Sequence, residues 1–422
     1  MDKCPYISCG EELKLSPNFC SSCNEKIIIC PTHSCSAPNR SLASFCWNCG
    51  KELKEPADWR MYKANPQLTG CSSMSFYPPP PDIESSNPQW SINIAAKVFS
   101  SLITAYGYLF ILSKDGNVHI IKQSNGKKIS TISLEEPHES VLTPAISNKT
   151  LFVALSKSLY AYKLTPLANN EAPIMLWRTQ SLAENEIFAT NVLMENDKVF
   201  MGSFDRRDTK IYAIDPKTSR IVWEQRLNGK SSSFALKDNK LILTTKDRIY
   251  AININTGDQL WNASISEEVI VNIPPVISGD LIYFFNSKNR LCLLNLHNGI
   301  PAAMLGNIEV TGVNSFSLSS SAIFITSGIG RVFKYSISGG LIWSWENRGI
   351  AGVDSITSYP VVSERTMITG SGMGYLYIFD LTSSTCQVTI KRTFTKAIRS
   401  SPAISDSRMF VCSVDGELYA YA

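Results

Sequence analysis

The sequence predicts an all-β protein in which an eight-bladed β-propeller follows two small cysteine-rich units. Three observations support this prediction. From about residue 95 the chain consists of short apolar stretches rich in Ile, Val, Tyr and Phe, separated by Gly, Asn, Asp and Ser, without helical periodicity. A short aromatic phrase recurs eight times in this region, at intervals of roughly 42 residues. Eight of the twelve cysteines lie within the first 49 residues.

The composition is that of an ordered globular protein. Apolar residues make up 44% and charged residues 18% of the 422 residues, which excludes a mostly disordered, collagen-like or coiled-coil chain. The longest clear apolar run, residues 106–112, has the length of a strand, so we expect no membrane span. The sequence opens with Met-Asp-Lys-Cys-Pro and no apolar signal segment, which predicts a cytoplasmic protein. The net charge of +4 indicates no particular partner.

The cysteines of the N-terminal region form a duplicated pattern. The second set of four repeats the first with a shift of 26 residues at every position, and each unit reads Cys-x4-Cys-x10-Cys-x2-Cys. This register favours two successive four-cysteine sites over one interleaved site. The candidate metal ligands are Cys4, Cys9, Cys20 and Cys23 in the first unit and Cys30, Cys35, Cys46 and Cys49 in the second.

Four thiolates from two close pairs suit tetrahedral zinc, so we predict two structural Zn²⁺ ions. Each ion would supply the stability that about 25 residues cannot obtain from an apolar core. Sulfur would fill all four positions, which leaves none for a catalytic water. A disulfide framework, which needs an oxidising compartment, and an iron–sulfur cluster, which usually has tighter cysteine spacing, are the weaker alternatives. His33 could replace Cys35, but the first unit has Ile7 at that position.

The Phe-Cys pairs at residues 19–20 and 45–46 and the Cys-Trp-Asn-Cys-Gly run at residues 46–50 resemble the double zinc ribbon family. The resemblance covers residues 4–53 and implies structural zinc with a protein or nucleic-acid contact. Four residues rather than two separate the first cysteine pair of each unit, which departs from many ribbons. Residues 1–56 hold six basic and six acidic side chains. With two zinc–thiolate centres the region would carry a charge of about −4, which favours a protein partner over nucleic acid.

Three phrases keep the same order in the repeats that follow. The first is an apolar strand with an aromatic residue at its second position. A Pro-Ala-Ile-Ser type of phrase often precedes that position by 16 or 17 residues, and a turn with tryptophan often follows, as at Trp223, Trp261 and Trp343. Each repeat thus accommodates about four strands, which is a propeller blade. The eight second positions are His119, Tyr160, Tyr212, Tyr250, Cys292, Phe333, Tyr377 and Tyr419.

The two ends of the repeat region predict how the ring closes. The last repeat ends with Leu-Tyr-Ala-Tyr-Ala at residues 418–422 and has no tryptophan strand, whereas residues 89–94, with Trp90, match that strand at the other end. We expect the two to pair, which would remove an exposed sheet edge. The predicted domains are zinc ribbons at residues 1–27 and 28–53, a linker at residues 54–58 and the propeller at residues 59–422.

The phrases LYAYA and IYAID, the run INTGDQLW and the lead-in WRMYKANPQLTG resemble the pyrroloquinoline-quinone-type (PQQ-like) propeller family over residues 59–422. For the enzymes of that family, the resemblance implies a quinone cofactor beside two adjacent cysteines, together with calcium and a catalytic aspartate. No two cysteines are adjacent here, and we assign no catalytic or cofactor-binding residue. The family also contains binding-only proteins, so the fold does not fix the function.

We therefore expect a non-enzymatic, zinc-binding scaffold whose propeller is a platform for protein partners and whose zinc ribbons are a structural or second contact module. Two alternatives remain open: an oxidoreductase that binds a quinone or a sugar in the propeller channel, and a nucleic-acid-associated factor that binds through the zinc ribbons. Cys292, Cys386 and Cys412 are interpreted as small buried apolar residues. The charged loop at residues 204–210 is a weak candidate for a partner contact.

Overall fold

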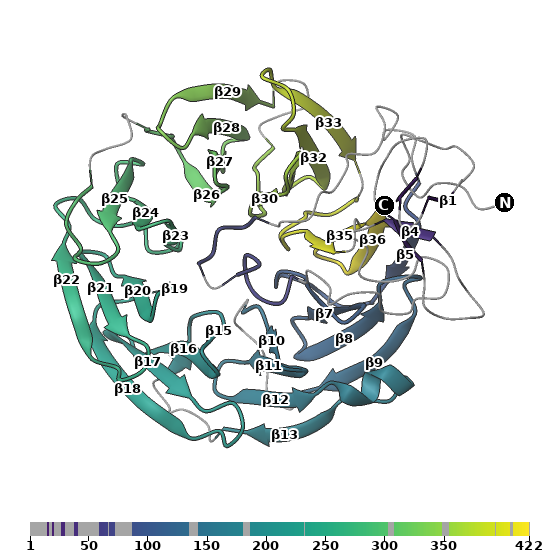
Figure 1. Cartoon of the computed structure of the whole chain (residues 1–422), viewed down its shortest axis with the longest axis horizontal. Coiled ribbons are helices and arrows are strands. Elements are labelled where there is room, and N and C mark those ends of the chain that lie inside the picture. Colours follow the sequence, from purple (N-terminus) through teal and green to yellow (C-terminus); the bar gives the residue numbers. More distant parts are fainter. Residues whose placement is uncertain are drawn as a thin grey trace.

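The computed structural model forms a ring of eight antiparallel sheets that follow one another along the chain (Figure 1). It describes residues 59–65, 67–71, 87–134, 142–179, 186–231, 233–302, 308–347, 354–392, 394–405 and 408–421, together with four short strands nearer the N-terminus. Within these residues every regular element is a β-strand except the short 3-10 helix η2 (Thr165–Asn169). The all-β, eight-bladed architecture expected from the sequence is confirmed.

The blades are numbered 1 to 8 in chain order, and their strands run from the ring axis outwards. The innermost strands of blades 1 to 8 are β6 (Ile103–Ala105), β10 (Ala145–Ser147), β15 (Leu193–Glu195), β19 (Phe234–Lys237), β23 (Val276–Ser278), β26 (Val313–Leu318), β30 (Val361–Val362) and β34 (Ala403–Ser405). The second strands are β7 (Tyr108–Leu112), β11 (Thr150–Ala154), β16 (Lys198–Phe204), β20 (Lys240–Thr244), β24 (Leu281–Phe285), β27 (Ala322–Ser327), β31 (Thr366–Gly370) and β35 (Arg408–Cys412).

The third strands contain the aromatic phrases of the repeat. They are β8 (Asn117–Lys122), β12 (Leu159–Lys163), β17 (Asp208–Ile214), β21 (Arg248–Asn253), β25 (Leu291–Asn295), β28 (Arg331–Ser336), β32 (Tyr375–Asp380) and β36 (Glu417–Tyr421). The outermost strands are β9 (Lys128–Ser133), β13 (Ile174–Arg178), β18 (Ile221–Asn228) and β22 (Gln259–Ser264) in blades 1 to 4, then β29 (Leu341–Glu346), β33 (Gln387–Arg392) and β5 (Trp90–Asn93) in blades 6 to 8.

The core lies between the blades, on the second and third strands. Both faces of each sheet pack against neighbouring sheets, so β11 and β27 are buried in continuous runs, whereas the outermost β22 alternates between partly buried and exposed side chains. Of the predicted aromatic positions, Tyr160 and Tyr377 are buried, and so is His119, which replaces an aromatic residue. Cys292, Phe333 and Tyr419 are half-buried.

The ring closes as the sequence predicts. Strand β5 pairs antiparallel with β36, with Ala420 opposite Trp90, and completes the sheet of blade 8 in the order β34-β35-β36-β5. The closing strand comes from the start of the repeat region and the other three strands from its end, so the two ends of the propeller hold each other. This pairing covers the edge of β36, which another chain could otherwise extend.

Tryptophans of the outermost strands join one blade to the next. The Trp223 indole of blade 3 lies on the turn before β22 of blade 4, where Gly257 has φ +82° and an added Cβ would come within 2.8 Å of the indole. Glycine fits there because it tolerates positive φ and leaves room for the ring. Four of these indole N–H groups donate to a carbonyl of the next blade: Trp90 to Gln123 (2.9 Å), Trp177 to Pro216 (2.9 Å), Trp223 to Ile254 (3.0 Å) and Trp261 to Leu296 (3.2 Å).

Two blades depart from the four-strand pattern. Blade 3 has a fifth strand, β14 (Ile187–Phe188). Both β14 and β15 pair with β16. In the described part of blade 5 only three strands pair, and the place of a tryptophan strand is taken by Ile300-Pro301, with a single bridge from Leu294 to Pro301. Proline cannot donate to a sheet ladder, which limits pairing there.

The two faces of the ring are defined by strand direction. Turns from the first to the second strand and from the third to the fourth lie on one face, which we call the lower face. Turns from the second to the third strand, and the connections from each outermost strand to the next blade, lie on the other, the upper face. This follows from the antiparallel order of the blades.

Residues 59–71 run through the middle of the ring (Figure 1). Their carbonyls accept hydrogen bonds from backbone N–H groups near or within the innermost strands of five blades. Three residues other than glycine, Lys63, Ala64 and Leu68, have positive φ, which lets the segment turn within the channel. The bonds run from Thr104 to Trp59 (2.9 Å), Ile146 to Arg60 (2.8 Å), Ile277 to Gln67 (3.0 Å), Leu318 to Thr69 (2.9 Å) and Val362 to Gly70 (3.0 Å).

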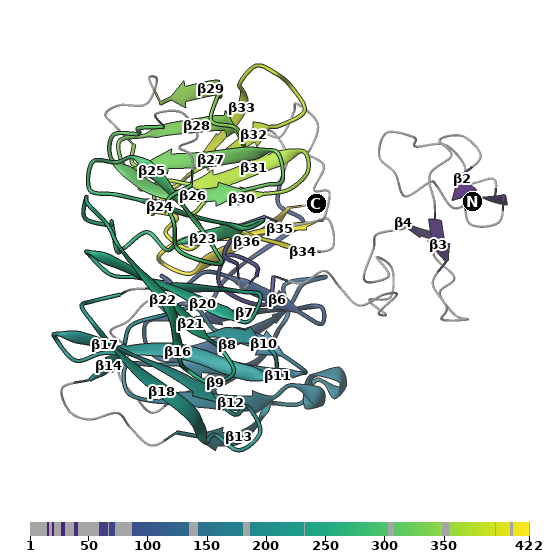
Figure 2. The same cartoon turned by 60° about the vertical axis from the view of Figure 1, so that its left-hand side comes forward.

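Before the ring, two short hairpins are described (Figure 2). Strand β1 (Leu15–Ser16) pairs with β2 (Phe19–Cys20), and β3 (Ile27–Ile29) pairs with β4 (Pro38–Arg40), both antiparallel. One hairpin falls within residues 1–27; the other starts at the end of that range and continues into residues 28–53. The remaining residues of both ranges, and the linker predicted at residues 54–58, lie outside the described residues.

Candidate functional site

A lysine side chain lies buried at the centre of the ring. Lys63 is 3% exposed, and its ammonium donates to the carbonyl of Phe316 at 2.8 Å. The Nζ atom lies 5.3 Å from the Phe316 ring centroid and 4.9 Å from that of Tyr359. Among the described residues no ion pair involves Lys63. Burial lowers its pKa from 10.5 to about 7, because the charged form loses its hydration.

Aromatic and apolar side chains surround this lysine in the channel. Tyr62 meets Tyr359 edge to face with ring centroids 5.1 Å apart, and Leu68 is fully buried. The segment therefore takes up the space in which the oxidoreductase hypothesis would place a cofactor or a sugar. A ligand at this level of the channel would have to displace residues 59–71 from their hydrogen bonds to five blades.

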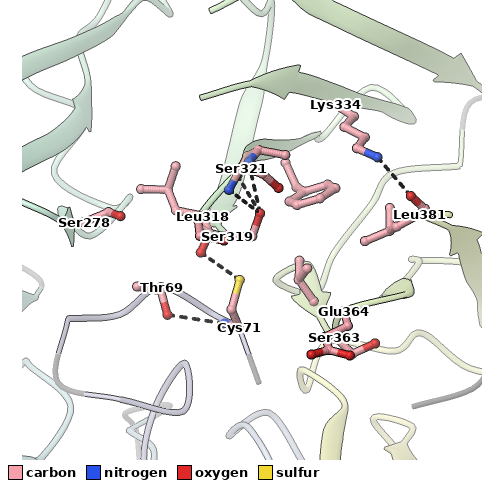
Figure 3. Close-up of a pocket in the computed structure, with 14 residues that line it drawn as sticks. Thr69, Cys71, Ser278, Leu318, Ser319, Ser321, Lys334, Ser363, Glu364 and Leu381 are labelled. Carbon is pink, nitrogen blue, oxygen red and sulfur yellow. Dashed lines mark hydrogen bonds between the residues drawn. The ribbon is translucent and has the colours of Figure 1, made fainter. Parts of the chain in front are cut away.

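A pocket opens on the lower face between blades 5, 6 and 7, beside the end of the channel segment (Figure 3). Its volume is about 550 Å³, within the range of small-molecule sites. Burial lowers the pKa of Lys334, whose ammonium donates to the carbonyl of Leu381 at 3.3 Å. The lining residues are Thr69, Cys71, Ser278, Leu318, Ser319, Ser320, Ser321, Ala322, Phe324, Lys334, Val362, Ser363, Glu364 and Leu381.

The hydroxyl and thiol groups of this pocket serve the fold. Ser319 accepts from the backbone N–H of Ala322 at 3.0 Å, and Ser363 accepts from that of Thr366 at 3.2 Å, so both cap the lower-face turns that follow β26 and β30. The Cys71 thiol donates to the carbonyl of Leu318 at 2.7 Å, and burial raises its pKa to about 12. A thiol that stays protonated is a poor nucleophile.

A buried carboxylate on the upper face is also fully engaged. Asp354 is 1% exposed and accepts from the hydroxyl of Tyr377 at 2.8 Å and from the backbone N–H of Met373 at 3.0 Å. Burial, together with the Asp354 carboxylate, raises the pKa of the Tyr377 hydroxyl. The side-chain amide of Asn347 donates a further hydrogen bond to that hydroxyl at 2.9 Å. The group ties the start of blade 7 to its third strand.

The charged loop at residues 204–210 forms the turn between β16 and β17. Arg226 bonds to Asp205 at 2.7 Å and to Asp208 at 2.9 Å, and Lys210 pairs with the buried carboxylate of Glu186. These contacts fasten the loop to blade 3. The weak sequence signal for a partner contact is therefore explained in large part by pairing within the blade.

Large exposed apolar side chains gather on the outer rim of blades 2 to 6. Nine of the twelve described ones lie at the beginning of outermost strands or at the equivalent place in blade 5, with exposed fractions between 41% and 60%. In blades 1 and 7 that strand begins with Lys128 and Gln387, and the apolar residue that follows each of them is only half exposed. We call the set the apolar rim: Ile174, Met175, Leu176, Ile221, Val222, Leu260, Ile300, Leu341 and Ile342.

The sequence-predicted metal ligands fall almost entirely outside the described residues. Cys20 is part of β2, and Cys30 follows β3 directly in the sequence. Within the part of the chain that the structure describes, no three His, Cys, Asp or Glu residues form a cluster able to hold a metal. The eight-cysteine zinc prediction thus stays a prediction.

The other cysteines can be compared with their sequence interpretation. Cys412 is fully buried, which confirms the prediction for that residue, whereas Cys292 and Cys386 are only half-buried. Burial raises the pKa of all three thiols. The sequence alone missed the channel segment, the pocket and the apolar rim. Only the rim has a local signal, an apolar pair before each of Trp223 and Trp343.

No helix of the described residues is long and apolar enough to cross a bilayer.

A family model for the outer membrane protein assembly factor BamB matches residues 114–337 and 174–385, which together cover more than half of the chain. Among curated proteins, the outer membrane protein assembly factor BamB of Yersinia pestis is 20% identical over 392 residues, or 84% of this chain and 95% of that protein.

Two solved structures show the same fold at low identity. BamB from Moraxella catarrhalis is 16% identical with a TM-score of 0.60, covering 79% of this chain and 96% of that chain. Quinohemoprotein alcohol dehydrogenase from Comamonas testosteroni is 11% identical with a TM-score of 0.68, covering 86% and 80%. An assembly factor and an enzyme share the architecture, so the function must be argued from the sites.

Proposed function

Because this chain belongs to the family of the outer membrane protein assembly factor BamB, we propose that it is a non-enzymatic scaffold that holds protein partners on its propeller. Its N-terminal region would be a zinc-binding contact module, and its place of action the cytoplasm, where thiols stay reduced. Residues 59–71 run through the channel and accept backbone hydrogen bonds from the innermost strands of five blades. Their position there supports the scaffold over the oxidoreductase.

The apolar rim is the observation that carries this proposal. Exposed apolar side chains scattered singly need no explanation, but a set that recurs at the same place in successive blades suggests a surface for contacts around the outside of the ring. Here five successive blades present exposed apolar side chains just before or at the start of the outermost strand, whereas blades 1 and 7 begin that strand with a polar residue followed by a half-buried apolar one. The tryptophans nearby, such as Trp223 and Trp343, are buried against the ring, so the exposed side chains outside them are free to meet a partner.

Replacing Met175 and Ile221, which lie in neighbouring blades, together by serine should remove a partner bound at this part of the rim without harming the ring. Both side chains are more than half exposed, so we expect little change in thermal unfolding and a loss of most partner binding. The measurement is quantitative mass spectrometry of proteins that co-purify with the full-length chain from its native cell.

The matched control changes Lys128 and Gln387 to serine at the corresponding places of blades 1 and 7. This variant should keep the wild-type partners. Identical partner sets for all three proteins would contradict the platform at the rim. Absorbance of a co-purified quinone would instead favour the oxidoreductase.

We further propose that the eight N-terminal cysteines hold two structural Zn²⁺ ions. The donor set is chemically suitable, since four thiolates satisfy zinc completely. The β3–β4 hairpin is compatible with this, because Cys30 and Cys35 both fall in the sequence between its two strands. Bound zinc would stabilise each short unit and offer no open position for chemistry.

Metal analysis of the purified chain should give two zinc ions per molecule. Cys35→Ser should reduce this to one, because three thiolates bind far more weakly, whereas His33→Ala should keep both. Chelation should release zinc while the thermal unfolding of the propeller stays unchanged. Zinc-free protein with an unaltered N-terminal region, or loss of an ion in His33→Ala but not in Cys35→Ser, would refute the assigned ligands.

A further inference from the structure

A group of cations lies on the upper face where blades 7, 8 and 1 meet. Lys97 is in the connection from β5 to β6, Lys114 in the turn between β7 and β8, and Lys396 and Arg399 in the connection from β33 to β34. All four side chains are exposed. We call this set the basic seam, since it lies across the junction at which the ring closes.

Backbone hydrogen bonds hold these three segments together. The N–H of Lys114 donates to the carbonyl of Lys97 at 2.7 Å. Val414, in the β35–β36 turn, donates to the carbonyl of Ala397 at 2.8 Å, and the N–H of Val98 donates to the carbonyl of Val414 at 2.9 Å. The cations are therefore positioned by a continuous backbone network.

Two of the cations contact the same aromatic ring. Phe99 is half-buried, with Lys114 Nζ 5.9 Å and Arg399 Cζ 5.7 Å from its ring centroid. Attraction of each cation to the ring offsets part of the repulsion between them. The result is a local concentration of positive charge on a chain whose total is only +4.

The same face is neutralised on the opposite side of the ring. In blades 4 to 6 four upper-face cations form ion pairs: Lys246 with Glu268 (2.7 Å), Lys288 with Glu267, Arg290 with Glu309 (3.1 Å) and Arg331 with Glu346 (3.1 Å). Among the described residues, no ion pair involves any cation of the basic seam.

The acidic residues beside the seam are held by their own turns. Asp115 accepts hydrogen bonds from Ser113 and, at 2.8 Å, from Asn117, and Asp415 accepts one from Ser413. These carboxylates are therefore directed to their own turns, and the seam keeps an excess of positive charge available to a partner.

We propose that the basic seam binds an acidic segment of a protein partner. Its four cations match carboxylates spaced along an extended peptide, and Met373, 41% exposed in the neighbouring β31–β32 turn, offers an apolar contact. Single-stranded nucleic acid is the poorer match, because it needs aromatic faces on which bases stack, and cations already cover Phe99. The seam lies on other blades than the apolar rim, so this proposal and the proposed function are tested separately.

The test measures fluorescence anisotropy of a labelled octaglutamate peptide titrated with the full-length chain in 25 mM and in 200 mM NaCl. We expect binding that weakens at least tenfold at the higher salt. Lys114→Glu together with Arg399→Glu should weaken binding at low salt by at least tenfold. The matched control, Lys246→Glu with Lys288→Glu, makes the same change of total charge on the paired side of the face and should stay within threefold of wild type.

Equal losses in the two double variants would overturn the proposal, because only total charge would then matter. An oligothymidylate of equal charge, or vesicles with phosphatidylserine, that bind more tightly than the peptide and lose that binding in the seam variant would reassign the seam to nucleic acid or to membrane. No binding of octaglutamate at 25 mM NaCl would also overturn it. Unchanged thermal unfolding of both variants is the check that exposed residues alone have been altered.

Discussion

Trp90→Ala is expected to lower the free energy of unfolding by about 3 kcal/mol and to open the ring at one junction. The indole contacts Phe410 of its own blade, with ring centroids 5.9 Å apart, and covers Gly126 of blade 1. It also donates to the carbonyl of Gln123 at 2.9 Å. Its loss removes the packing that holds blade 8 against blade 1, where no peptide connection other than the closing strand itself joins the two ends.

Urea unfolding and limited proteolysis measure this effect, with Trp261→Ala as the matched control. Trp261 is half-buried like Trp90 and makes the same kind of bond, to the carbonyl of Leu296 at 3.2 Å, but between blades that follow each other in the chain. Both variants should be destabilised. Only Trp90→Ala should be cleaved early between residues 87 and 97 and should aggregate through the exposed edge of β36. Equal cleavage in both variants would mean that the junction between blades 8 and 1 is no more vulnerable than a junction between blades that follow each other in the chain.

The blade count and the closure were within reach of sequence reasoning because they depend on local patterns. The third strands repeat with their aromatic second positions, and Trp90 matches the strand that the last repeat lacks. The buried strands could be predicted from the same pattern, because a strand that packs on both faces has a continuous apolar sequence. Blade 5 shows where the pattern weakens, because Pro301 stands where a tryptophan strand would continue.

The sites could not be predicted from the sequence, because they join residues that are far apart in the chain. The channel segment has no strand periodicity, and its hydrogen bonds go to five different blades. The pocket near Cys71 and the basic seam both form where turns of separate blades meet, so no single stretch of sequence indicates them. Zinc binding is the opposite case, because cysteine spacing is a strong local signal in the sequence. Apart from Cys20 in β2, the predicted ligands lie outside the described part of the chain.

The buried lysine should make the stability of the ring depend on pH, and Lys63→Met should remove that dependence. Burial lowers the pKa of Lys63 from 10.5 to about 7. Between those values the unfolded chain binds the proton and the folded chain does not. Stability therefore rises with pH in this window, by about 1.4 kcal/mol per pH unit for this one group, and the contribution of the charged lysine is most unfavourable below pH 7.

Cys71 changes stability with pH in the opposite direction, and it sets the upper limit of the pH range in which the effect of Lys63 can be measured. Burial raises the pKa of its thiol from 9.0 to about 12, so above pH 9 the unfolded chain loses this proton first and stability falls. The two slopes then offset each other. Burial also raises the pKa values of Tyr62 and Tyr359 above 10.0, which affects still higher pH. Measurements between pH 7.5 and 9 therefore isolate Lys63.

Urea unfolding of the wild type and of Lys63→Met at several pH values in this range gives the test. Methionine keeps the length and fills the space between Phe316 and Tyr359, and an apolar side chain in place of an unpaired buried charge is generally favourable. The variant should be the more stable protein near pH 7, with an advantage that shrinks by about 1 kcal/mol per pH unit as the wild-type lysine loses its proton. The exposed control Lys149→Met should follow the wild type at every pH. Parallel curves for wild type and Lys63→Met would show that the ammonium reaches water, and the channel would then be open at its centre.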